Sequence, residues 1–102
     1  MVARRQSARR PTHPGELLRE VVLPSLNRSK VEIARLLDIS RESLYRILDE
    51  KQPVTPPMAL KLGKLCGNGP HLWLQMQANY DLWQAEREID VTAIPTLEAI
   101  DI

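Results

Sequence analysis

The 102-residue sequence lacks phenylalanine, has one cysteine, and contains two Trp and two Tyr as its only aromatic residues. Aliphatic side chains must therefore fill most of a core. A lone Cys66 excludes an internal disulfide, and one cysteine with two scattered histidines cannot form a zinc site. No Ser, His and Asp group shares one predicted face, and no glycine-rich phosphate loop occurs. The sequence thus predicts neither an enzyme nor a bound cofactor.

Long apolar runs are also missing. The uncharged stretch 52–60 contains three prolines, whereas a membrane helix needs about 20 consecutive apolar residues. The N-terminus is basic but has no apolar stretch behind it, which argues against a signal peptide. We therefore expect a cytoplasmic protein that does not enter a membrane.

The charge is unevenly distributed, although its sum is only +1. Residues 1–30 hold seven Arg or Lys and two Glu, a net charge of +5, and residues 86–102 hold five acids and one Arg, a net charge of −4. A basic front and an acidic end favour different partners for the two ends. The alternative is that both are solvated ends without a partner.

Apolar spacing predicts an all-α fold of five short helices, with no strand before residue 89. Pro14 suits the first turn of the first helix, which Pro24 is expected to stop. Ser29 and Ser40 are the residue types that cap helices, and we expect them to open the second and third. Weak alternation over residues 89–94 fits either a short edge strand or an extended tail that orders against a partner.

The fourth helix is expected between Pro56 and Gly67, and the fifth begins at Pro70. Four large side chains lie three or four residues apart along the fifth helix: Trp73, Met76, Tyr80 and Trp83. Such a stripe is either a stacking platform for single-stranded nucleic acid or part of a core or dimer contact. We favour packing, because the chain has no other large aromatic residues.

Residues 29–50, SKVEIARLLDISRESLYRILDE, are the most informative stretch. Two predicted helices meet across the turn 38–40, and small Ala34 lies where the second must cross the first. Five apolar residues are spaced to share one core: Ile33, Leu37, Ile39, Leu44 and Ile47. This pattern is typical of a helix-turn-helix, whose second helix offers a polar face to the DNA major groove. The alternative is an ordinary αα-hairpin.

The first turn residue of this motif is usually glycine, because the chain there is left-handed, but here it is Asp38. Aspartate tolerates that conformation better than most residues, so we expect the turn to form at some cost in stability.

The exposed face of the second helix supplies the candidate base-reading residues. Arg41 and Arg46 can each bind a guanine, and Glu42 can accept a hydrogen bond from a cytosine amino group. Ser43 and Tyr45 can reach a base edge or a thymine methyl group.

Other residues are candidates for DNA phosphates. Ser29, Lys30 and Ser40 lie at helix starts, and Lys51 follows the second helix, where phosphates commonly bind. Arg28 adds a further cation. For the two serines, helix capping alone is the competing interpretation.

The sequence resembles the Xre/Cro class of helix-turn-helix proteins over residues 29–50. The resemblance narrows to the HigA (also called VapI) antitoxins with residues 13–16 (HPGE), 54–62 (VTPPMALKL) and above all 73–83 (WLQMQANYDLW). It covers about residues 12–88. The usual Asn-Gly-Lys after the recognition helix is Asp49-Glu50-Lys51 here, which places two acids near the expected groove.

The resemblance implies a lambda repressor-like five-helix domain that binds double-stranded operator DNA as a homodimer and represses its own operon. It also implies neutralisation of a HigB-like toxin, an mRNA-cleaving RNase of the RelE type. Two alternatives stay open: a plain Xre-type regulator without a toxin, and a protein–protein adaptor that has lost DNA binding. We expect a flexible basic arm (residues 1–11), a helix-turn-helix DNA-binding domain (12–88) and an acidic C-terminal tail (89–102).

Overall fold

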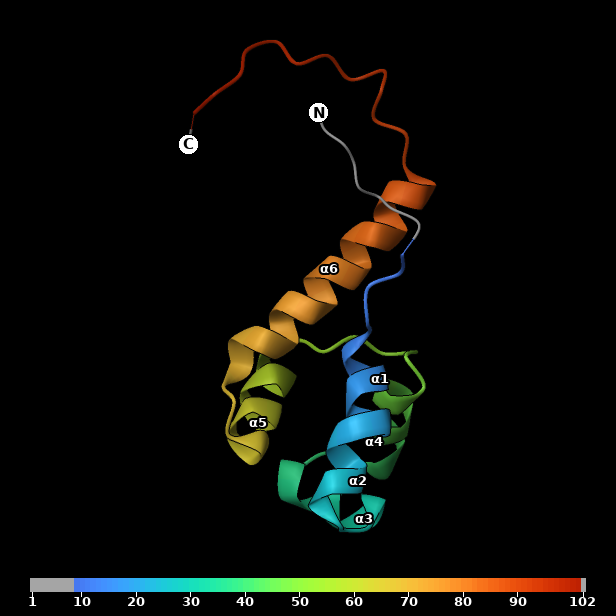
Figure 1. The fold of residues 1–102 in the computed structure, drawn as a ribbon, viewed down its shortest axis with the longest axis vertical. Helices are drawn as coiled ribbons and strands as arrows, with labels where there is room; N and C mark the ends of the chain where they lie inside the picture. The colour runs from blue at the N-terminus through green and yellow to red at the C-terminus, as the bar shows by residue number, and fades with distance from the viewer. Residues whose placement is uncertain (1–8, 102) are drawn as a thin grey trace.

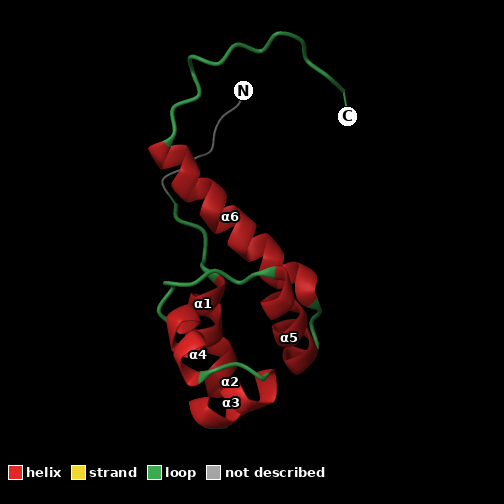
Figure 2. Ribbon diagram, turned by 180° about the vertical axis from the view of Figure 1, so that it is seen from behind, coloured by secondary structure: helices red, strands yellow, loops and turns green. Residues whose placement is uncertain are grey.

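The computed structural model describes residues 9–101, and its helices lie between Pro14 and Glu88, separated by short loops (Figure 1). No strand occurs in this described part (Figure 2), so the all-α prediction is confirmed. Most of the predicted basic arm lies outside the described residues. The elements are α1 (Pro14–Leu17), η1 (Leu18–Val22), α2 (Leu23–Leu26), α3 (Lys30–Leu37), α4 (Arg41–Leu48), α5 (Pro56–Cys66) and α6 (Pro70–Glu88).

The first three elements form one continuous helical stretch, and the prediction that Pro24 ends it is wrong. The intervening η1 is a wider π-helical turn, in which the Leu23 N–H bonds back to the Leu18 carbonyl. Pro24 therefore falls in the first turn of α2, where its missing N–H is tolerated. The stretch ends at Asn27, whose φ of 55° is left-handed.

The predicted helix starts at Ser29 and Ser40 are confirmed. The Ser29 hydroxyl accepts a hydrogen bond from the Glu32 N–H at 3.1 Å, and the Ser40 hydroxyl accepts one from the Ser43 N–H at 3.0 Å. Between the two helices, Asp38 is left-handed as expected, with a φ of 57°. Each cap pairs a backbone donor that the helix itself leaves unpaired.

The core lies where α3 and α4 meet η1, α5 and the start of α6. The largest fully buried side chains on these elements are Leu18, Ile33, Leu44, Ile47, Leu62 and Trp73. Burying each aliphatic side chain stabilises the fold by about 1.5–3 kcal/mol. Ala34 is also buried and Ile39 is half-buried against the same cluster, so the predicted shared core is confirmed.

Only the first half of α6 belongs to this core, and the rest projects from the body of the protein (Figure 1). Trp73 is fully buried and its Nε1 donates to Asn68 at 3.1 Å. Buried Gln77 accepts a hydrogen bond from the Val54 N–H at 2.7 Å. Beyond Glu88 the chain is exposed, with one turn near Val91, and forms no edge strand up to residue 101. No helix among the described residues is both long and apolar enough to span a membrane.

His13 connects the start of α1 to α6. Its side chain is buried, its Nδ1 accepts a hydrogen bond from the Gly15 N–H at 2.9 Å, and its ring packs edge-on against Tyr80 with centroids 4.8 Å apart. Burial lowers the pKa of His13, an effect that outweighs the nearby acids Glu50 and Asp81. The folded protein thus favours the neutral imidazole, which the cap requires.

We predict that the free energy of unfolding falls as the pH drops below 6.5, the ordinary histidine pKa. The unfolded chain then binds a proton that the folded chain does not bind until the pH is lower still. Substituting His13→Asn keeps a capping oxygen but removes the titration, so the loss between pH 7 and pH 5 should shrink. Urea unfolding at a series of pH values measures this. The exposed histidine supplies the control, His71→Asn, and an equal flattening by both variants would contradict the prediction.

Candidate nucleic-acid interface

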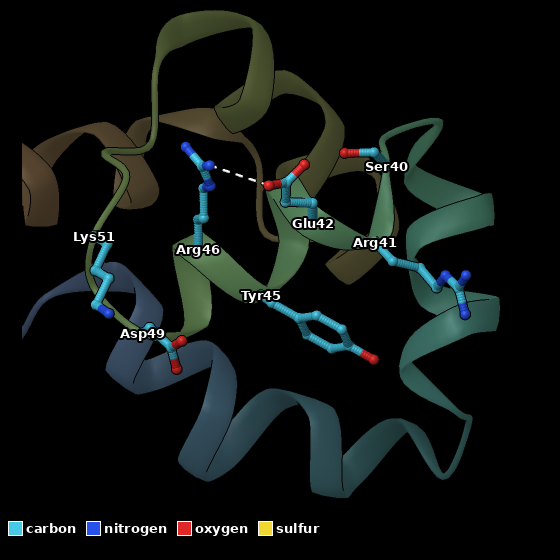
Figure 3. A pocket seen from close by; sticks show the side chains of 7 residues that line it. All are labelled: Ser40, Arg41, Glu42, Tyr45, Arg46, Asp49 and Lys51. Atoms are coloured by element: carbon cyan, nitrogen blue, oxygen red, sulfur yellow. Dashed lines mark hydrogen bonds and ion pairs between the residues drawn. The ribbon is translucent and has the colours of Figure 1, made fainter.

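One face of α4 is open to solvent and forms the floor of a shallow hollow (Figure 3). Seven residues line this hollow: Ser40, Arg41, Glu42, Tyr45, Arg46, Asp49 and Lys51. Six of them are on α4 or next to its ends, and Lys51 lies in the loop that follows. The opposite face of α4, with Leu44, Ile47 and Leu48, is buried in the core. One side of α4 therefore packs in the core, and the other side is free to contact a partner.

The start of α1 fixes the position of α4 from behind. A Cβ atom on Gly15 would lie only 1.9 Å from the backbone oxygen of Ile47, so no larger residue fits there without moving one of the two helices. Arg19, one turn further along, donates a hydrogen bond to the carbonyl of Leu48. This bond pairs one of the carbonyls that the end of a helix leaves without a partner. The α4 helix is thus held at its C-terminal end.

The candidate base-reading residues share this face. Arg41 and Tyr45 are exposed, and the side chains of Arg46 and Glu42 form an ion pair at 3.1 Å (Figure 3). Ser43 is half-buried and does not line the hollow.

The candidate phosphate contacts divide into two groups. Ser40 and Lys51 line the hollow, whereas Arg28, Ser29 and Lys30 lie before or at the start of α3. The ammonium of Lys30 still reaches α4, because it lies 5.8 Å from the centre of the Tyr45 ring. Arg28 pairs with Glu32 on α3.

The two acids after α4 behave differently. Asp49 is exposed and lines the hollow, whereas the Glu50 side chain is only 19% exposed and does not line it. The Glu50 N–H bonds to the Ile47 carbonyl and the Lys51 N–H to the Arg46 carbonyl, which is the hydrogen-bond pattern of a Schellman helix ending. Of these two acids, only Asp49 therefore faces the expected groove.

Glu50 occupies the left-handed position of this helix ending, where glycine is usual, and its φ is 62°. That conformation costs a residue with a side chain about 1–2 kcal/mol. The carboxylate is held by Arg10 at 3.0 Å and by Arg19 at 3.5 Å. Arg10 also pairs with Glu16 at 3.0 Å and lies over the Tyr80 ring.

The sequence placed Glu50 near the expected groove but gave Arg10 and Arg19 no part in this site. The one available signal was an acid at a position that normally needs glycine, since such a residue requires compensating contacts. The identity of those contacts was not readable, because they join residues 31 and 40 positions apart.

No protein-family model matches the chain. Among curated proteins it is 37% identical over 84 residues to the uncharacterized HTH-type transcriptional regulator YddM of Escherichia coli K12, covering 82% of this chain and 88% of that protein. It is 30% identical over 79 residues to antitoxin HigA-1 of Vibrio cholerae, covering 78% of this chain and 74% of that protein. These relatives are transcriptional regulators and antitoxins, families that are not enzymes.

Among solved structures, antitoxin GraA in complex with its operator superposes with a TM-score of 0.80 at 34% identity, covering 91% of this chain and 97% of GraA. Sequence relatives and structural neighbours therefore agree with each other and with the helix-turn-helix geometry of α3 and α4. The chain belongs to the HigA/VapI-type antitoxins of the Xre/Cro helix-turn-helix family.

Proposed function

We propose that this protein is an antitoxin and autorepressor that binds operator DNA through α4 as a homodimer and neutralises a HigB-like, RelE-type toxin. The observation that carries the proposal is the exposed polar face of α4, on a helix fixed from behind by α1 and Arg19. The operator complex of the structural neighbour GraA supports it.

The residues proposed to contact bases are Arg41, Arg46, Glu42, Tyr45 and Ser43. Arg41 has no ion-pair partner among the described residues. Arg46 is paired with Glu42, but an exposed pair one helical turn apart contributes only about 0.3–0.5 kcal/mol. A two-pronged arginine–guanine contact discriminates by about 1–3 kcal/mol, so DNA can displace this pair. Tyr45 and Ser43 then meet a base edge or a thymine methyl group.

Phosphate contacts fall to Ser29 and Ser40 at the starts of α3 and α4, and to the cations Arg28, Lys30 and Lys51. Exposed backbone N–H groups at a capped helix start attract phosphate oxygens. Such contacts fix the orientation of the protein on DNA but carry no sequence information.

We predict that operator binding weakens steeply with salt, because contacts between cations and DNA phosphates supply most of it. If a dimer makes about eight phosphate contacts, log K should fall with log salt concentration at a slope of about −7. Lys51→Ala removes one contact from each subunit, so it should weaken binding to all sequences alike and flatten that slope by about two. Arg41→Ala should instead relax preference at one base pair of each half-site.

Fluorescence anisotropy on the promoter of its own operon, with single-base variants at several salt concentrations, separates these roles. A Lys51→Ala protein with altered sequence preference and an unchanged slope would show that the assignments are wrong.

Dimerisation is proposed because one recognition helix reads too few base pairs to select a site in a genome. Two subunits demand a palindrome with half-sites about 34 Å apart, or a multiple of that. Leu72 and Leu82 on α6 are 45% and 59% exposed, whereas Leu74 is half-buried against the core. Leu82 lies in the second half of α6, the part that projects from the body of the protein, and this part therefore offers apolar surface for a second copy.

We expect Leu82→Glu to convert the dimer to a monomer without unfolding it, because Leu82 is largely exposed. Light scattering gives the mass and circular dichroism the helix content. The control is Gln84→Glu, two residues on and therefore about 200° around the same helix. A folded Leu82→Glu protein that stays dimeric and still binds its operator would show that the dimer interface lies elsewhere.

The toxin contact is proposed for the acidic tail, because a protein that represses while bound to toxin must keep α4 available for DNA. A toxin that grips RNA is expected to be basic, which suits the net charge of −4 over residues 86–102. The tail also exposes five large apolar side chains, each at least 59% accessible, and the last four lie at intervals of three: Ile89, Val91, Ile94, Leu97 and Ile100. Acids alternating with exposed apolar residues suit a segment that orders on a partner.

Deleting residues 89–102 should abolish toxin neutralisation while leaving the helices folded. Co-expression with the neighbouring toxin gene and counting of viable cells measures the effect. A second variant with Asp90, Glu98 and Asp101 changed to their amides should lose part of the affinity, since it keeps the apolar side chains. Full neutralisation by the truncated protein would show that the toxin does not bind the tail. The absence of a toxin gene next to the gene for this protein would favour the plain regulator.

A further inference from the structure

The turn after α4 has a strained backbone at Glu50, and ion pairs of the Glu50 side chain hold it in place. Glu50 is left-handed, with a φ of 62°, where glycine would be unstrained. The turn is followed at once by Lys51, which lines the hollow in front of α4. The backbone conformation at Glu50 therefore decides the direction in which Lys51 leaves the helix.

Three contacts hold this turn from the side opposite the hollow. Arg19 donates both to the Leu48 carbonyl and to the Glu50 carboxylate, and Arg10 donates to the other Glu50 oxygen at 3.0 Å. The hydrogen bond to Glu50 raises the pKa of Arg10. The negative charge of Glu50 is thus matched by two cations and turned toward α1 and α6.

We propose that Arg19 and Glu50 are positioning residues for the DNA interface: they fix the turn that aims Lys51 at a phosphate, and they keep the Glu50 charge away from the duplex. This inference rests on the proposed DNA binding. It reverses the simple expectation from charge, under which any acid next to the groove repels DNA and its removal strengthens binding.

Adjacent acids provide a matched test, because Asp49→Asn and Glu50→Gln change the net charge equally. Asp49 is exposed and lines the hollow, so Asp49→Asn should strengthen binding to the operator. Glu50→Gln loses the ion pairs that hold the turn, so it should weaken binding roughly threefold to tenfold, on the order of one phosphate contact. Anisotropy titrations on one promoter fragment at one salt concentration compare them.

Two further variants separate positioning from general stability. Glu50→Gly adopts the left-handed turn without help from any ion pair, and should therefore restore most of the affinity. In a Lys51→Ala background, Glu50→Gln should cost almost nothing more, because the side chain that it positions is already gone. A merely destabilising change would add its full cost in both backgrounds.

Arg19→Lys keeps the charge but cannot donate to two acceptors in the same fixed geometry, so it should weaken binding in the same Lys51-dependent way. This variant also serves if Glu50→Gln fails to fold, which circular dichroism reveals. Stronger binding by Glu50→Gln, or equal losses in the glutamine and glycine variants, would overturn the inference while DNA binding itself stands. Failure of the unmodified dimer to bind any promoter fragment would instead overturn the proposed function and this inference with it.

Discussion

The structure depends on the direct backbone contact between the start of α1 and the end of α4. Gly15 lies against the Ile47 carbonyl so closely that a single added carbon would overlap it. The residues around Gly15 serve the same junction: His13 caps α1, Pro14 occupies its first turn, and Glu16 pairs with Arg10. The HPGE motif thus fixes the position of α4 relative to α1.

That junction explains how an acid is tolerated immediately after the recognition helix. In isolation, Glu50 combines a strained backbone with a charge of the wrong sign for DNA. In the folded chain its carboxylate bonds to Arg10 and Arg19, which hold it on the α1 side of the turn. The strained, acidic turn after α4 is thereby linked to Arg19 on η1 and, through Arg10, to Tyr80 on α6.

Local signals were sufficient to predict much of this fold. Ser29 and Ser40 announce helix starts, and Asp38 takes the left-handed turn that its place between two helices requires. The prediction from Pro24 failed because the wider turn η1 precedes it, so that Pro24 lies in the first turn of α2, where its missing N–H is tolerated. The contacts of Glu50 could not be read either, since they depend on which distant residues the fold brings together. The exposed face of α4 was predictable, whereas its support from behind was not.

Operator binding and the positioning role of Glu50 both require that DNA binds at the exposed face of α4. The most direct test is a titration of the isotope-labelled protein with a duplex from its own promoter, followed by nuclear magnetic resonance of the backbone amides. We predict that the largest shift changes occur over residues 40–51 and at Lys30, whose ammonium lies next to Tyr45. Changes confined to α6 and the tail, or none at saturating DNA, would contradict it.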